Sequence, residues 1–70
     1  MEKMIFVVVE DEQVMLATCE HRKITTYLEN SIGGGTALVS NWLAVLNTHN
    51  DWLFTGKGRK VHVTMLPFFG

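Results

Sequence analysis

One cysteine and a nearby histidine are the first residues whose types could do chemistry. Cys19 and His21 stand two positions apart, and a cysteine with a histidine base can act as a nucleophile. Side chains two apart share a face on a strand but splay apart on a helix. No third group is evident that would orient the histidine, and a lone cysteine usually packs as a small hydrophobe. With no acid–base pair or cofactor loop either, we predict no catalytic residues and a protein that is not an enzyme.

Two other sets of residues lack the spacing that a metal or a phosphate requires. The potential metal ligands do not form the two close pairs of a zinc site; they are His21, His49, Asp51 and His62. The glycines at 33–35 run into a predicted helix, whose free N–H groups could hold an anion. The lysine and hydroxyl of a phosphate loop are missing there. We therefore expect no metal and no cofactor.

The cationic residues suggest one possible kind of partner. Five of the six fall in two clusters, Arg22 and Lys23 in the first and Lys57, Arg59 and Lys60 in the second. If the helix that carries the first cluster meets the loop that carries the second, the five form one basic patch. The net charge of −1 excludes a protein that coats nucleic acid with its whole surface. A local patch still predicts, as the alternative function, a nucleic-acid-binding regulator.

Large apolar side chains are the other candidates for binding. Hydrophobic residues make up 47% of the chain, which is more than one small core can hide, so some of them should lie at an interface. Tryptophan and phenylalanine are common anchors of protein interfaces. The predicted partner-binding residues are Trp42, Trp52, Phe68 and Phe69.

The length of the chain limits the size of the fold that can position these side chains. A chain of 70 residues is one domain and buries only about 60% of the surface that it exposes when unfolded. Cys19 is the only cysteine, so no internal disulfide can help, and self-association is the remaining remedy. We therefore predict a homodimer. The longest apolar run, Met4 to Val9, is too short to span a membrane, and no signal peptide is evident, so we expect a cytoplasmic protein.

The first half of the chain has one clear strand and one ambiguous segment. Met4 to Val9 is rich in β-branched residues and apolar on both alternating faces, which is typical of a central strand covered on both sides. Residues 11–31 allow two interpretations. In one, Asp11 and Glu12 form a tight turn, Gln13 to Thr18 is a strand, and Thr18 caps a helix over 19–30. In the other, Asp11 caps one long helix to residue 31. The β-favouring run after Gln13 favours the hairpin.

The second half contains a helix and a hairpin. The glycines at 33–35 break the chain, and a helix with an unusually wide apolar face is expected over 37–48. Residues 52–55 and 59–66 then form a hairpin around a glycine–lysine–glycine turn. Val61, Val63 and Met65 should point to one face of its last strand, and Pro67 should end the pairing.

These elements give a fold class and a function class. The order is β-β-α-α-β-β, which predicts one small α+β domain over residues 1–70 with an antiparallel sheet and two helices packed on one face. Without catalytic or cofactor residues, the favoured function is a non-enzymatic protein-interaction module. Small stand-alone domains of this kind often act as accessory regulators or inhibitors, for example in phages and mobile elements. We expect its partner to be another protein.

Overall fold

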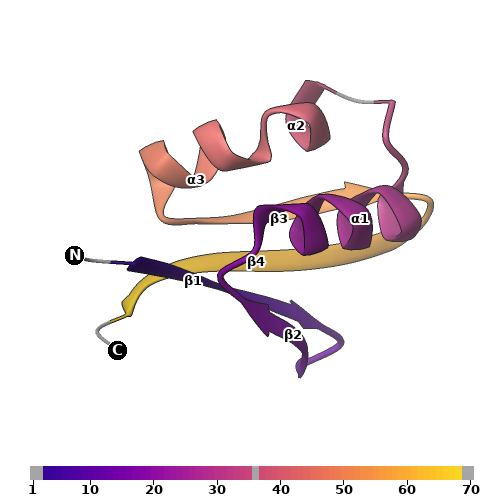
Figure 1. The fold of residues 1–70 in the computed structure, drawn as a ribbon. Helices are drawn as coiled ribbons and strands as arrows, with labels where there is room; N and C mark the ends of the chain where they lie inside the picture. Colours follow the sequence, from indigo (N-terminus) through magenta and orange to yellow (C-terminus); the bar gives the residue numbers. More distant parts are fainter. Residues whose placement is uncertain (1–2, 36, 69–70) are drawn as a thin grey trace.

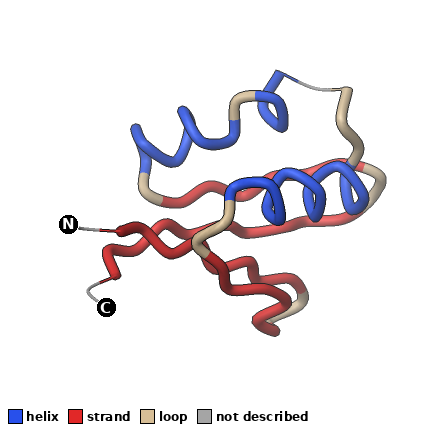
Figure 2. The backbone as a smooth tube through the Cα atoms, in the orientation of Figure 1, coloured by secondary structure: helices blue, strands red, loops and turns tan. Residues whose placement is uncertain are grey.

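The computed structural model describes residues 3–35 and 37–68, which form a four-stranded antiparallel sheet with its helices on one face (Figures 1 and 2). The strand order is β2-β1-β4-β3, so β1 and β4 are central and β2 and β3 are the edges. This confirms the predicted α+β class. The elements are β1 (Lys3–Glu10), β2 (Gln13–Thr18), α1 (His21–Ile32), α2 (Ala37–Ser40), α3 (Trp42–His49), β3 (Asp51–Gly56) and β4 (Arg59–Phe68).

The first hairpin confirms the strand interpretation of residues 11–18, and the single long helix is wrong. Asp11 and Glu12 make a two-residue turn with φ values of 54° and 64°, the left-handed pair that matches the twist of adjacent strands. The predicted cap is also wrong. The Thr18 hydroxyl accepts a hydrogen bond from the Glu20 N–H at 3.0 Å, so Thr18 closes the turn before α1, and the helix starts at His21 instead of residue 19.

The predicted second helix is interrupted. Its two parts, α2 and α3, meet at Asn41, whose side-chain amide donates a hydrogen bond to the Ala37 carbonyl at 3.1 Å. An asparagine that bonds its own backbone competes with the helical hydrogen bonds and bends the chain. The bend lets Val39 and Trp42 both point into the core, 3% and 4% exposed.

The last hairpin follows the predicted alternation but runs further than expected. Val61 and Val63 are fully buried against the helices, and Met65 packs beside them. Pairing continues past Pro67 to Phe68, so the prediction that Pro67 ends it is wrong. The Met65 N–H points to the β3 side, where it donates to the Asn50 carbonyl. Pro67 has the same orientation but lies beyond the start of β3, where no N–H is needed.

The core fills the space between the sheet and the helices. Its buried apolar residues come from every element except β2, and they are Phe6, Val8, Ile24, Leu28, Ile32, Val39, Trp42, Leu46, Phe54, Val61 and Val63. At one end the helix layer touches the sheet backbone, because a Cβ on Gly56 would lie 2.5 Å from the Ile32 carbonyl oxygen. Only glycine fits this contact, which sets the end of α1 directly on β3.

Within residues 3–35 and 37–68, no helix has the length and apolar character needed to cross a membrane.

Candidate interaction surfaces

The sheet face opposite the helices is apolar and has no covering layer in the part of the chain described by the structure (Figure 1). We call this surface the helix-free face. The strand register places its side chains in rows across the four strands, and they are Ile5, Val7, Val9, Val14, Ala17, Leu53, His62, Thr64 and Leu66. Leu53 is 49% exposed, Leu66 46% and Val14 66%. These three are among the few large hydrophobic side chains exposed to solvent.

Polar groups lie at the side and end of the helix-free face. Asp51 on β3 and His62 on β4 approach each other to 3.9 Å between Oδ1 and Nε2, with both side chains partly exposed. Lys60 lies at the hairpin end of β4, paired across the strands with Thr55. Apart from Lys3 at the start of β1, the rows over β1 and β2 contain no charged residue. The face is therefore an apolar patch with a polar border, which resembles a small protein interface.

Two of the four predicted aromatic anchors, Trp42 and Trp52, do not lie on this face. Trp42 is in the core and its Nε1 donates to the Thr25 hydroxyl at 2.8 Å. Trp52 lies on the covered side of β3, half-buried, with its ring 4.8 Å from that of His49. The backbone of Phe68 pairs with Lys3, and Phe69 lies outside the described residues. Trp42 and Trp52 therefore take no part in the helix-free face.

The two basic clusters lie at opposite ends of α1. Lys57 belongs to the turn that follows Gly56, and Gly56 contacts Ile32 at the end of the helix. Arg22 lies ten residues earlier on the same helix, about 15 Å away at 1.5 Å per residue. The structure therefore does not bring the five cations together at one end of the helix, and nucleic-acid binding stays a prediction.

Two of the five cations already have acidic partners. Lys23 pairs with Glu20 at 3.1 Å on the surface of α1. Arg59 binds Glu10 through two hydrogen bonds, from Nε and Nη2, each 2.7 Å long. Among the described residues this leaves Arg22, Lys57 and Lys60 without an ion pair.

The pair of Glu10 and Arg59 is part of a polar network that the sequence analysis missed. Tyr27 on α1 donates to the same carboxylate at 2.8 Å, so the network ties β1, β4 and α1 together. The hydrogen bonds from Arg59 and then from Tyr27 hold the pKa of Glu10 below its ordinary value. Burial, followed by the hydrogen bond to Glu10, raises the pKa of Tyr27. Because both carboxylate oxygens of Glu10 have a donor, the buried polar network is satisfied and stabilises the fold.

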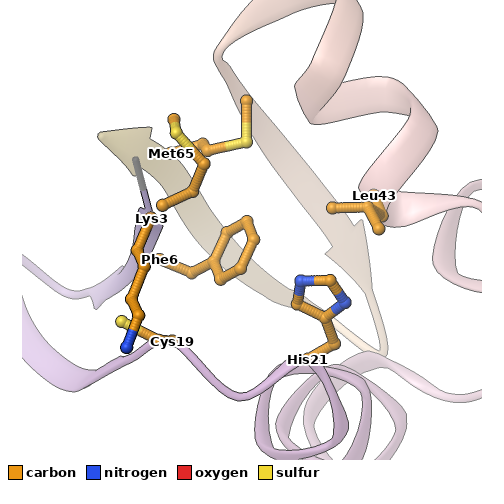
Figure 3. A pocket seen from close by; sticks show the side chains of 7 residues that line it. Lys3, Phe6, Cys19, His21, Leu43 and Met65 are labelled. Atoms are coloured by element: carbon orange, nitrogen blue, oxygen red, sulfur yellow. The ribbon is translucent and has the colours of Figure 1, made fainter. Parts of the chain in front are cut away.

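Cys19 and His21 line a pocket of about 390 Å³ at the end of the sheet where the chain begins (Figure 3). The other lining residues are Lys3, Met4, Phe6, Leu43 and Met65. The His21 ring packs edge-on against Phe6 at 5.2 Å between centroids, and the Cys19 sulfur lies apart from it across the pocket. This arrangement does not place the thiol against a histidine base.

The described residues contain no group of three or more acidic, histidine or cysteine side chains that could hold a metal ion. The glycine segment at 33–35 follows the end of α1, and Gly33 is the C-cap of the helix. Gly33 has a φ of 94°, and its N–H donates to the Glu29 carbonyl.

No protein-family model, no curated protein and no solved structure matches this chain.

Proposed function

We propose that the protein is a non-enzymatic interaction module that binds an apolar surface of another protein with the helix-free face of its sheet. The observation that supports this most is β1, whose residues are apolar on both faces although helices cover only one. Ile5, Val7 and Val9 remain partly exposed on the other side. Binding a partner there would remove apolar surface from water, at about 25 cal/mol per Å².

The pattern of charges supports an apolar partner. Apart from Lys3 at the start of β1, the rows over β1 and β2 have no charge that a partner would need to neutralise. The polar border can select among partners by its charges. Asp51 and Lys60 have opposite signs and lie at different places on this border. A partner with an apolar centre and its own mixed rim would match this face.

A module of this kind acts by covering a surface of its partner, which is how a small accessory regulator or inhibitor works. We place this activity in the cytoplasm, because the single cysteine forms no internal disulfide and so suits a reducing compartment.

The test uses affinity capture with matched variants. The double variant Leu53→Lys with Leu66→Lys puts two charges on the helix-free face. The control Leu38→Lys makes the same change on α2, where Leu38 is 48% exposed. Each tagged protein is incubated with a nuclease-treated cell lysate and washed at high salt. We expect the same protein partner to be retained by the wild type and by Leu38→Lys, and to be at least tenfold depleted on the double variant.

Two outcomes would contradict the proposal. If Leu38→Lys loses the partner and the double variant keeps it, the helix layer is the binding surface. If all recovery disappears after nuclease treatment, the target is nucleic acid, and Arg22, Lys57 and Lys60 become the first residues to change. Urea unfolding of each variant would show that the loss of binding is not a loss of folding.

A further inference from the structure

The edge strand β2 is an open template for pairing with another strand. β2 is the outermost strand on one side of the sheet, and among the described residues only β1 pairs with it. An edge strand presents a row of unpaired N–H and C=O groups, and proteins normally protect such edges with lysine, proline, a short strand or a β-bulge. β2 has a register shift near its start, but none of its six residues is charged or a proline, and its second half, Leu16 to Thr18, pairs regularly with β1. Val14 and Met15 are 66% and 49% exposed.

A groove runs along this edge between α1 and β2. It has a volume of about 380 Å³ and is lined by Leu16, Arg22, Lys23, Thr26, Tyr27 and Asn30. Leu16 and Thr18 of β2 point toward the helix layer, because they lie opposite Val8 and Phe6. A second strand beside β2 would direct alternate side chains into the same groove.

Unpaired charges of opposite sign lie at the two ends of β2. The turn before the strand carries Asp11 and Glu12, neither of which forms an ion pair within the described residues. After the strand come Glu20, which pairs with Lys23, and then Arg22 in the first turn of α1, which is without an ion pair among the described residues. The unpaired charges at this edge are therefore acidic at its start and basic at its end.

We infer that a second copy of the chain pairs with this edge, β2 against β2 in antiparallel orientation, and forms a symmetric dimer with one eight-stranded sheet. Antiparallel pairing brings the start of each strand to the end of the other, so each acidic turn lies near the Arg22 of the other copy. A parallel partner strand of the same sequence would place like charges together. Leu16 of each copy would enter the groove of the other.

The register shift in the first hairpin limits which part of β2 can pair regularly with another strand. The shift falls between Val8 and Val9, so Met15 has no direct partner in β1. The regular part of the edge is thus Leu16 to Thr18, centred on Ala17. Pairing about Ala17 is symmetric, as a twofold dimer requires.

The dimer would also enlarge the helix-free face, although the inference does not depend on the proposed function. Four strands about 4.8 Å apart, with seven residues of each at 3.3 Å, give one face a footprint of roughly 400 Å². Twofold pairing in the plane of the sheet puts both helix-free faces on the same side. The joined face is then roughly 800 Å², which is the area that each partner contributes to a standard interface.

The test is a charge exchange followed by sedimentation equilibrium on the purified protein. Arg22→Glu and Glu12→Arg each reverse one exposed charge, and each should weaken the dimer about tenfold because two contacts are lost at once. An equal mixture of the two variants should form a heterodimer of nearly wild-type affinity, since both ends are again matched. Lys60→Glu, a reversal on β4 away from this edge, should have little effect.

Amide hydrogen exchange provides an independent readout of strand pairing. The Ala17 N–H should exchange more slowly as the protein concentration rises, and this protection should disappear in Arg22→Glu. A wild type that remains monomeric at high micromolar concentration would overturn the inference. So would a dimer that is weakened by Leu53→Lys but keeps its affinity in Arg22→Glu, because it would use the helix-free face. Neither result depends on whether another protein binds.

Discussion

The two faces of β1 are built from the same kinds of residue but have different surroundings. Phe6 and Val8 are 1% and 0% exposed beneath the helices. Val7 and Val9, their neighbours in sequence, remain partly accessible on the helix-free face. Apolar residues on both faces of a strand therefore show that each face can be buried, but not which one the helices of the same chain will cover.

The neighbouring strand decides which face the helices cover. In the first half of β4 the residues alternate, with Val61 and Val63 on one side and Lys60 and His62 on the other. Val8 lies opposite Val63. The register therefore places Val8 on the face that the helices cover and Val7 on the helix-free face. The helix-free face is apolar over β1 and mixed over β4, and this difference is what makes it a candidate for a partner.

The largest expected effect comes from truncating one side chain on each face of β1. Phe6→Ala should lower the free energy of unfolding by about 3–5 kcal/mol, because a cavity remains under the helices. Ile5→Ala removes a side chain that is already partly exposed, and should cost about 1–2 kcal/mol. Urea unfolding followed by circular dichroism, at low protein concentration, measures both values.

An equal cost at the two positions would contradict this view of the sheet. If Ile5→Ala is as damaging as Phe6→Ala, then the helix-free face is buried in the free protein. Repeating the measurement at several concentrations would separate the two possible reasons. A cost that rises with concentration points to another copy of the chain on that face, whereas a constant cost points to the fold itself.

Much of the fold could be predicted because its signals are local. The β-branched run of β1, the alternation in β4 and the two-residue turn at Asp11 each depend on neighbouring residues alone. The predictions were wrong where contacts between distant residues or the backbone conformation determine the structure. Asn41 bends the second helix so that Trp42 reaches the core. Pairing with β1 passes Pro67 because Pro67 lies beyond the start of β3, where no N–H is needed.

The candidate site was harder to predict for the same reason. Leu53 and Leu66 are exposed only because no layer covers their face, which no local pattern reveals. The Glu10 network joins residues that are 17 and 49 positions apart in the chain. The sequence did favour a protein that binds through apolar side chains over an enzyme. That function class remains a proposal.

A second prediction compares two glycines. Gly56 lies where the sheet contacts the end of α1, and Gly35 lies outside this contact. Gly56→Ala would force the end of α1 away from β3, because the new Cβ would lie 2.5 Å from the Ile32 carbonyl oxygen. We expect a loss of about 1–3 kcal/mol. Gly35→Ala is the control, since a Cβ there meets nothing within 4 Å. Thermal unfolding of both variants measures the difference, and equal melting temperatures would mean that α1 does not rest on Gly56.

The smallest expected effect compares the acidic residues of the two faces. Glu10 is buried among its donors on the covered face, and Asp51 is exposed beside His62 on the other. The hydrogen bonds from Arg59 and Tyr27 lower the pKa of Glu10 in the folded state below its ordinary value of 4.5. Glu10 therefore contributes stability that is fully present above about pH 4.5, and this stability is lost as the pH falls through the lower, folded-state value.

The variant Glu10→Gln should accordingly show a shallower decline of the free energy of unfolding below pH 4.5 than the wild type, because it has no proton to take up there. Asp51→Asn is the matched control, and its acid-side slope should stay closer to that of the wild type. The difference is small because Arg59 is partly exposed, and solvent screens its charge. Urea unfolding at a series of pH values measures both slopes. A Glu10→Gln slope as steep as that of the wild type would show that other carboxylates cause the loss in acid, and that the network holds the two strands and the helix together without a charge.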